Sequence, residues 1–479
     1  MGSASVLPDS PRLSERFLAL RVATFLPLAL AAAIVALLFV DQLGYLLITV
    51  LLATWFALWS VPFWIEGRID WFQPVTYMSL WAARNFLRAL QWVWTGEIES
   101  TLLYASPGGL ASLFQRALVI KVAGLGALLC GYYLWRVRPE RARMVLRFPQ
   151  KINQSRLRWV LVSLAVTALG GYSYLLSSVG GLWAYLIGWG TGRRAMLSGK
   201  FYVLAILITF GSVILFALAR AWQGRARLSQ QLGLLTAAVL YSGILASLGV
   251  RSYVVLFWCI AAGLYHYLKR PIRSLHLVGL AVLVFLFSTL MYDIRAAAFR
   301  GEISEGDLPA VSVRSEALGR FVTEDFLARG MDNLLVAVHV FPDYIPWQSG
   351  RSWLNLLALP VPRGLWPDKP VMTVGGLLRD QYFGGGGSLP VGYDGTLYAN
   401  FRLPGVILGM ALLGILFRSF YEGFKNRRGN SYAVFLYVII LNQVSDGLSP
   451  EAFTQLALYV LPLVPVLCFV SRGPAARPI

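Results

Sequence analysis

The sequence is poor in the residues that build redox centres, metal sites and soluble surfaces. It has three cysteines and three histidines in 479 residues, and only 14% of its residues are charged, whereas ordinary soluble domains carry about a quarter. The cysteines, Cys130, Cys259 and Cys468, each lie inside an apolar run. A disulfide framework and a cysteine-based metal cluster are therefore excluded.

Motifs for nucleotide phosphates are also missing. The four consecutive glycines at 384–387 are not followed by a helix with a Lys-Ser or Lys-Thr pair, which a phosphate-binding loop requires. We interpret this run as a flexible lid joint, with contact between its amides and a ligand as the alternative. No Asp-X-Asp pair occurs in the segments that we assign below to the external side. The sequence therefore predicts neither a bound metal nor a cofactor.

Apolar residues, in contrast, are abundant: 57% of the chain is hydrophobic and the mean hydropathy is +0.63. This composition predicts an all-α polytopic membrane protein. The first apolar stretch, 17–40, is too long for a signal peptide and lacks a small-residue cleavage site, so we expect it to remain as a span. The apolar runs predict spans near 19–40, 44–64, 113–135, 159–177, 201–219, 233–249, 252–268, 274–292, 403–418, 431–448 and 453–471.

The distribution of basic residues predicts the orientation of these spans in the membrane. The net charge is +19, and basic residues concentrate at 136–158, 220–227, 269–273 and 418–428 and in the tail, which predicts that these segments face the cytoplasm. Both termini are then cytoplasmic only if the number of crossings is even. A further crossing near 75–93 brings the predicted number of spans to twelve. Because this segment contains Arg84 and Arg88, a re-entrant or interfacial helix is the alternative.

This topology predicts two external segments. We expect a transmembrane bundle over 1–294 with an external loop at 178–200, a large external segment over 295–402, and C-terminal transmembrane helices over 403–479. The large segment is far longer than a connector, so we expect a folded binding site there. Within it, 318–341 has apolar residues at helical spacing and predicts an amphipathic helix on or near the bilayer.

The most distinctive stretch is 357–370, which reads LALPVPRGLWPDKP. Its prolines hold the backbone in extended geometry and present Arg363, Trp366, Asp368 and Lys369 beside the lipid. The guanidinium of arginine forms paired hydrogen bonds with phosphate, and aromatic rings stack on sugars. The stretch therefore suits an anionic, sugar-bearing headgroup, unless it is only a turn that connects two spans.

This stretch resembles the signature of the Wzy-type O-antigen polymerases, which join oligosaccharide repeat units. Similar patterns flank it along most of the chain: Gly180-Gly181-Leu182 with Tyr185 and the pair Arg193 and Arg194, then Gly249-Val250-Arg251, then Leu397 to Phe401 before Gly405. One position departs from the pattern. Arg402 stands where the family pattern has a glycine after Phe401.

The resemblance implies a membrane glycosyltransferase of the GT-C type in the bacterial inner membrane, with a periplasmic active site. Such an enzyme transfers the growing glycan from undecaprenyl diphosphate to a fresh lipid-linked repeat unit, extending the chain at its reducing end. Its partners would be undecaprenyl-diphosphate-linked oligosaccharides and membrane lipids, and no nucleic acid. Whether a chain-length regulator also binds is left open.

The leaving diphosphate must be stabilised by cations, and the external segments supply arginines for this. Arg251 is the strongest candidate because a charge at the junction of two spans is costly, with simple snorkelling to the interface as the alternative. Arg363 is a second catalytic candidate. The predicted diphosphate-binding residues are Arg193, Arg194, Arg295, Arg351 and Lys369.

The acceptor hydroxyl needs a base, and the sequence leaves several candidates open. They are Glu324, Asp325, His339, Asp343 and Asp368. A lone histidine on an apolar helix is more often a packing residue, which is the alternative for His339. The predicted sugar-stacking residues are Trp347, Trp353, Trp366 and Tyr398, although interfacial tryptophans and tyrosines also anchor membrane proteins.

Two other activities fit a polytopic, basic chain. A lipid-linked oligosaccharide flippase should carry charges through the centre of its bundle and show internal repeats, neither of which is evident in the sequence. An O-antigen ligase, which moves the finished glycan onto a lipid A core, is closely related and is not excluded. The LWPDKP stretch favours the polymerase.

Overall fold

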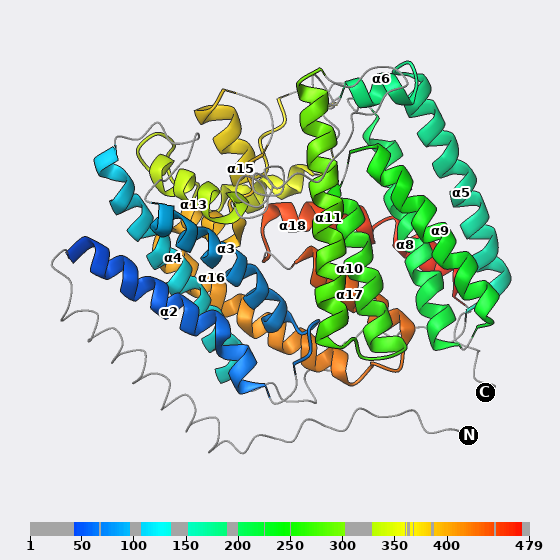
Figure 1. The fold of residues 1–479 in the computed structure, drawn as a ribbon, viewed down its shortest axis with the longest axis horizontal. Coiled ribbons are helices and arrows are strands. Elements are labelled where there is room, and N and C mark those ends of the chain that lie inside the picture. Colours follow the sequence, from blue (N-terminus) through cyan, green and yellow to red (C-terminus); the bar gives the residue numbers. More distant parts are fainter. Residues whose placement is uncertain are drawn as a thin grey trace. The chain divides into compact units, whose positions relative to one another are not determined.

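The computed structural model is all-helical across the residues that it describes (Figure 1). These residues are 43–66, 69–95, 107–135, 152–188, 200–224, 226–249, 251–301, 328–359, 361, 365–366, 368–384, 388–444 and 447–471. Eight helical stretches among them are long and apolar enough to cross a membrane. A polytopic helical membrane protein is therefore confirmed.

The spanning stretches follow the predicted apolar runs closely. They are Leu46–Ile65, Leu110–Leu134, Gln154–Ser177, Tyr202–Gln223, Leu228–Ser247, Ser274–Ala298, Gly392–Lys425 and Pro450–Val470. The predicted crossings near 75–93, 252–268 and 431–448 are also helices, but they are shorter or less apolar than these eight. The predicted first span, 19–40, lies outside the described residues.

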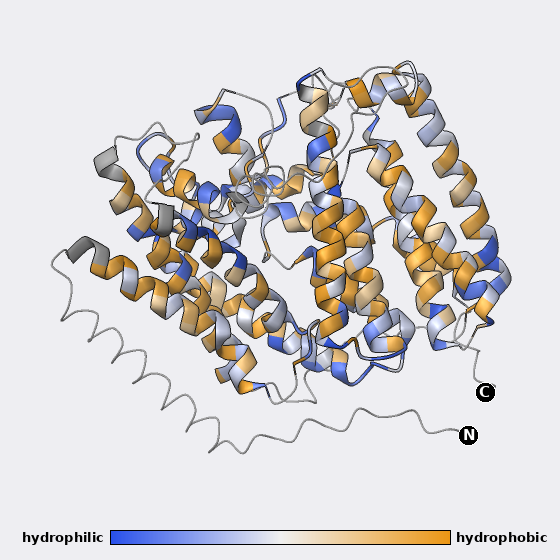
Figure 2. Cartoon of the chain, viewed as in Figure 1, coloured by the Kyte–Doolittle hydropathy of each residue, from blue (hydrophilic) through white to orange (hydrophobic). Residues whose placement is uncertain are grey.

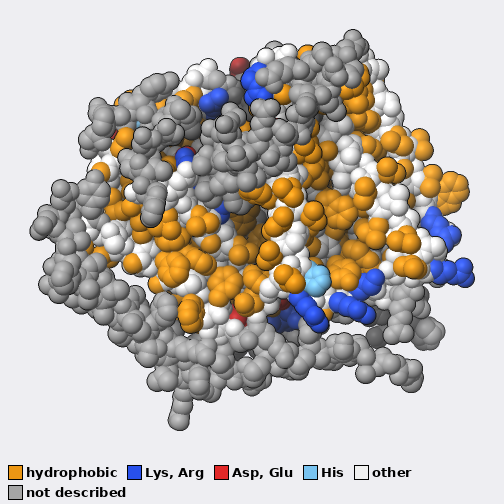
Figure 3. Space-filling model, in the orientation of Figure 1, with side chains coloured by type: hydrophobic (Ala, Val, Ile, Leu, Met, Phe, Trp, Pro, Cys, Tyr) orange, Lys and Arg blue, Asp and Glu red, His pale blue; other side chains and the backbone are white. Residues whose placement is uncertain are grey.

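Hydropathy explains where the helices end. Most of the long helices are apolar along their length, and hydrophilic residues collect near their ends and in the connections (Figure 2). On the face drawn in Figure 3, apolar side chains cover much of the described surface. Such a surface is unfavourable in water and suits a lipid environment.

The chain divides into two compact units. Unit 1 comprises Met1–Ala142, Thr323–Glu422 and Ser445–Ala452, and unit 2 comprises Arg143–Val322, Gly423–Val444 and Phe453–Ile479. Each unit is therefore assembled from segments that are far apart in the sequence.

Unit 1 pairs three long N-terminal helices with the segment that precedes α16. In it, α2 packs on α3 and α4, and α13 packs on both α3 and α4. Short helical turns then lead to α16. Its elements are α2 (Leu43–Ile65), α3 (Pro74–Thr95), α4 (Pro107–Leu134), α13 (Ala328–Val340), α14 (Arg351–Leu354), η2 (Asn355–Ala358), α15 (Val374–Leu377), the π-helical turn η3 (Leu378–Tyr382) and most of α16 (Gly392–Lys425).

Unit 2 is built around α8, which contacts α5, α9, α10, α17 and α19. The side chains of Phe216 and Leu218 on α8 are fully buried. The elements of this unit are α5 (Gln154–Ser177), α6 (Leu182–Ile187), α8 (Phe201–Gln223), α9 (Leu228–Ser247), α10 (Arg251–Leu268), α11 (Ser274–Phe299), α17 (Ser431–Gln443), most of α18 (Pro450–Val460) and α19 (Leu463–Val470).

The helix predicted at 318–341 differs from the expectation in its surroundings. Within the described part of that range, α13 runs over Ala328–Val340, and every residue from Met331 to Val338 is buried. A helix lying on a bilayer would leave its polar face in water. Here α13 is instead packed on all sides, and Gly330 permits this because a Cβ there would collide with the side chain of Asn85 on α3.

Candidate functional site

A break in α16 organises the candidate site of unit 1. Arg402 has φ 62° and ψ −162°, so α16 is two helices joined at this residue, with Pro404 two positions further on. This region of backbone space is populated almost only by glycine, and another residue there costs about 1–3 kcal/mol. Arg402 therefore has a glycine-like backbone at the position where the sequence pattern places glycine.

The break leaves carbonyl groups that no following helical turn can satisfy. The backbone N–H groups of Gln348 and Ser349 donate to the carbonyls of Ala399 (3.0 Å) and Asn400 (3.1 Å). Ser349 itself has a positive φ of 46°. The loop after α13 is thus fixed to the first half of α16.

The side chain of Asn400 completes this attachment. Its Oδ1 accepts from the N–H of Gly350 at 2.9 Å and from the hydroxyl of Ser352 at 3.0 Å. Its Nδ2 donates to the carbonyl of Thr396 at 2.8 Å. Asn400 is buried, so removing its amide would leave several buried polar groups without partners.

Trp347, which lies in this loop just before Gln348, is beside the break. Its ring meets that of Tyr398 edge to face at 5.3 Å, and the guanidinium of Arg402 lies 5.2 Å from the Trp347 ring centroid. The ring of Phe341 stacks on Trp347 at 6.2 Å. We call Trp347, Tyr398 and Arg402 the kink platform.

Charged groups surround this platform. Arg116 on α4 and Asp343 lie close enough to Tyr398 to interact electrostatically with its hydroxyl. The side chains of Arg116, Asp343 and Arg402 are exposed. The kink platform therefore combines aromatic rings with accessible charge of both signs.

His339 belongs to a second aromatic cluster at the end of α13. Its ring lies 5.2 Å from Tyr344 and 6.1 Å from Tyr382, and those two tyrosines meet at 5.3 Å. The ring of Phe383 extends the cluster from Tyr382 at 4.9 Å. These contacts suit either a packed histidine or a base within reach of a sugar that rests on the tyrosines.

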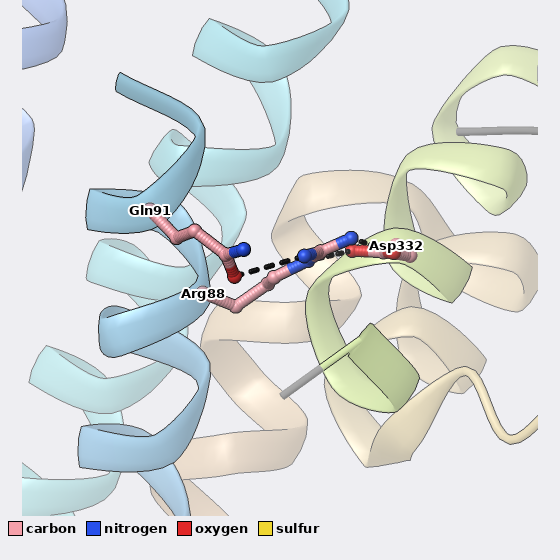
Figure 4. A network of polar contacts seen from close by, with 3 residues as sticks. All are labelled: Arg88, Gln91 and Asp332. Carbon is pink, nitrogen blue, oxygen red and sulfur yellow. Dashed lines mark hydrogen bonds and ion pairs between the residues drawn. The ribbon is translucent and has the colours of Figure 1, made fainter. Parts of the chain in front are cut away.

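A buried ion pair joins α13 to α3 (Figure 4). Arg88 donates from Nε to Oδ1 of Asp332 at 3.1 Å and from Nη2 to Oδ2 at 2.8 Å. Its Nη1 donates to Oε1 of Gln91 at 2.9 Å. Burial raises the pKa of the Asp332 carboxyl above its usual value, and the guanidinium opposes that rise. This two-pronged geometry fixes α13 in both position and rotation.

A second ion pair joins α4 to the start of α16. The ammonium of Lys121 lies 2.7 Å from Oδ2 of Asp394, and both side chains are nearly buried. Nearby, Nδ2 of Asn333 on α13 donates to the carbonyl of Pro390 at 2.9 Å. The segment that carries the kink platform is therefore held to the long helices of unit 1 by charge as well as by apolar packing.

Lys369, near the end of the Pro-rich stretch, forms hydrogen bonds with the backbone in the first half of the same stretch. Nζ of Lys369 donates to the carbonyls of Leu359 (3.2 Å) and Val361 (2.8 Å), and its side chain is buried. Nδ2 of Asn355 ties the same stretch to the carbonyl of Val371 at 2.9 Å. Lys369, predicted to bind diphosphate, thus donates to two carbonyl groups of its own stretch.

Other predicted residues of this segment lie near its surface. Trp353 stacks on Phe401 at 5.7 Å and donates from Nε1 to the carbonyl of Leu448 at 3.3 Å. Arg351, Trp366 and Asp368 are exposed. The exposed apolar side chains here are Leu354, Leu357, Leu365, Trp366 and Phe401, an arrangement suited to contact with lipid.

The remaining predicted residues lie outside the described residues or belong to unit 2. Arg193, Arg194, Glu324, Asp325 and Arg363 lie outside the described residues. Arg251 and Arg295 belong to unit 2: Arg251 is the first residue of α10 and is partly exposed, and Arg295 lies on α11. Trp347 and Tyr398 are in contact, and the candidate base Asp343 lies near Tyr398.

Several structurally important residues were missed by the sequence reasoning. They are Lys121, Asp332, Asp394 and Asn400. A charge inside an apolar run, as at Lys121, is a signal that could have directed attention to that helix. Its partner lies too far along the chain to be recognised from spacing.

Comparison with known proteins provides no identification. No protein-family model, curated protein or solved structure matches the chain. Among the described residues, no group of three or more histidine, cysteine, aspartate or glutamate side chains could hold a metal ion.

Proposed function

We propose that this protein is a membrane glycosyltransferase that polymerises lipid-linked oligosaccharide repeat units. The observation that carries the proposal is the kink platform, in which Trp347 and Tyr398, two residues predicted to stack on sugars, lie beside an exposed arginine. Aromatic rings beside a guanidinium match a ligand that is both a sugar and a phosphate ester. The exposed apolar side chains around Leu354 and Leu357 match a ligand that also carries a lipid.

The proposal includes a topology. Twelve crossings with both termini in the cytoplasm would place 178–200 and 295–402 on the periplasmic side of a bacterial inner membrane. Buried Arg88 has a partner in Asp332, which supports α3 as an element of the bundle despite its charge. The kink platform would then lie at the periplasmic boundary of the bilayer, where the diphosphate of a polyprenyl lipid also lies.

The proposed reaction needs no nucleotide. The bond between the donor sugar's anomeric carbon and the diphosphate oxygen breaks, and undecaprenyl diphosphate leaves with the electron pair. The acceptor hydroxyl oxygen bonds to that carbon, and its proton passes to a base. Arginines, among which Arg251 and Arg363 remain our proposed catalytic residues, would stabilise the leaving diphosphate. His339, Asp368 and Glu324 remain the proposed bases.

The test is a polymerisation assay in liposomes. Purified protein is incubated with lipid-linked repeat units of its own glycan, without nucleotide sugar and with a metal chelator, and the products are separated on a gel. We expect a ladder of polymer lengths. Arg251→Ala and Arg363→Ala should each reduce it by at least tenfold, while Arg379→Gln should leave it unchanged.

Two results would contradict the proposal. Translocation of the same lipid across the liposome bilayer without a ladder would make the protein a flippase. Transfer of preformed polymer to a lipid A core, again without a ladder, would make it a ligase.

A further inference from the structure

Arg402 combines a strained backbone with an accessible cation. Its φ of 62° is one that glycine adopts freely and that a residue with a Cβ adopts only under strain. Its side chain is nevertheless exposed, so burial of that side chain does not compensate for the strain. A residue that is strained and exposed at a break between two helices is a candidate for a role in binding.

The geometry of its guanidinium suits an anion. The group lies over the Trp347 ring, 5.2 Å from the centroid. Stacking uses the flat face of a guanidinium and leaves its N–H edges free to form paired hydrogen bonds to phosphate oxygens. The Trp347 ring also contacts the ring of Tyr398.

Two further charged side chains lie on the Tyr398 side of the kink platform. Arg116 on α4 and Asp343 in the loop after α13 both lie near Tyr398, so the kink platform has two guanidinium groups and one carboxylate nearby. A diphosphate carries two adjacent anionic groups. Arg116, near Tyr398, is thus a second cation on the kink platform beside Arg402.

We propose that Arg402 binds the diphosphate of the polyprenyl carrier lipid, with Trp347 as the residue that positions its guanidinium. This inference rests on the proposed function and adds to it the residue that holds the headgroup. The bound chemistry is a phosphate-ester anion on a lipid, which both the carrier lipid and bulk anionic phospholipid possess. The carrier is favoured because the site pairs its cation with aromatic rings that suit a sugar.

The experiment compares Arg402→Gly with Arg402→Gln. Purified variants in detergent are titrated with undecaprenyl diphosphate, and parallel titrations use undecaprenol and phosphatidylglycerol. Arg379→Gln is the matched control, because Arg379 also lies over an aromatic ring, that of Phe383 at 5.7 Å, but within the π-helical turn η3 and without a positive φ.

We expect both Arg402 variants to bind undecaprenyl diphosphate at least tenfold more weakly than the wild type and to bind undecaprenol equally well. Arg402→Gly should also raise the midpoint of thermal unfolding by a few degrees, since glycine relieves the backbone strain. Arg379→Gln should bind undecaprenyl diphosphate like the wild type. Greater stability with weaker binding is a combination that a purely structural arginine does not produce.

Unchanged affinity for undecaprenyl diphosphate in Arg402→Gln would overturn the inference. Equal affinity of the wild type for phosphatidylglycerol and undecaprenyl diphosphate would also overturn it. The ladder assay separates this failure from failure of the proposed function. A full ladder with unchanged lipid binding in Arg402→Gln refutes the role of Arg402 and leaves the polymerase. If the wild type makes no ladder but Arg402→Gln still binds undecaprenyl diphosphate more weakly than the wild type, the role of Arg402 in binding is supported and the polymerase is refuted.

Discussion

The two units differ in the buried side-chain contacts that hold their interiors together. Unit 1 holds charge inside: Arg88 pairs with Asp332 and Lys121 pairs with Asp394, all four largely removed from solvent. Unit 2 is packed around α8 by rings, with Phe216 lying 4.8 Å from Tyr432 and 5.2 Å from Phe435. Desolvating a charge is costly even when it is paired. The two buried pairs therefore stabilise unit 1 less than apolar packing of the same volume would, as expected if they serve to position the kink platform.

The close fit of unit 2 shows how its stability is obtained. Gly211 on α8 faces Tyr241 on α9, and a Cβ at that glycine would stand 2.3 Å from the tyrosine ring. Polar contacts in this unit include that from Nε1 of Trp258 to the hydroxyl of Ser242 at 3.0 Å. Such contacts define a scaffold that tolerates little change in volume.

The largest expected effect is at the charged pair. Asp332→Ala leaves Arg88 buried without its carboxylate and should cost about 3–5 kcal/mol of unfolding free energy, measured by denaturant unfolding in detergent. The double variant with Arg88→Met and Asp332→Leu should recover much of this loss. The control is Glu422→Ala, which breaks the partly exposed pair with Arg418 and should cost less than about 1 kcal/mol. Equal losses for Asp332→Ala and Glu422→Ala would contradict the contrast between the units.

Unit 2 should respond most strongly to added volume. Gly211→Ala forces its methyl group against the Tyr241 ring and should destabilise by about 1–3 kcal/mol, with no change in the ladder produced per folded molecule. The matched control is Gly233→Ala on α9, where a Cβ meets nothing within 4 Å. That change should stabilise by about 0.5–1 kcal/mol. Loss of activity per folded Gly211→Ala molecule would show that the reaction depends on the packing of α8 against α9 and not only on the residues of the proposed site.

Asn400 should affect function more than stability. Asn400→Ala removes the side chain that holds Gly350 and Ser352, which should cost about 1–3 kcal/mol and lower polymer yield at least tenfold by releasing Trp347 from its place. Yield per folded molecule is the quantity to compare. A destabilised variant with full yield would show that the loop does not need this attachment for activity.

The smallest effect should come from a helix cap in unit 2. Oδ1 of Asn153 accepts from the N–H groups of Ser155 and Arg156 at 3.1 and 3.2 Å. Asn153→Ala should cost about 1 kcal/mol and leave polymer yield per folded molecule unchanged. A yield loss as large as that of Asn400→Ala would erase the functional difference between the two units.

Much of the fold could be predicted because apolar length alone determines a membrane helix. The predicted run 44–64 matches α2 within one residue at each end, and the run 274–292 begins at the first residue of α11, which continues seven residues further. Arg88 made its helix unfavourable by hydropathy, and the partner that explains it, Asp332, lies 244 residues away. No local pattern contains such a pair.

The candidate site was predictable in its residue types and not in its geometry. Trp347 and Tyr398 were chosen because aromatic rings stack on sugars, but their contact depends on the break at Arg402 and on the carbonyls that this break frees. The sequence pattern indicated an unusual residue at 402. The backbone conformation there follows from how the loop after α13 and the first half of α16 pack together, which is a tertiary property.

The ion pair between Lys121 and Asp394 has a consequence for biogenesis. Lys121 lies within the apolar part of α4 and leaves the ribosome long before Asp394 is synthesised. Until then, α4 carries an unneutralised ammonium that lipid does not accommodate well. We expect α4 to remain at the insertion machinery, or shallow in the bilayer, until α16 arrives. Nascent chains that end before residue 394 should therefore be extracted and degraded more readily than the full-length chain.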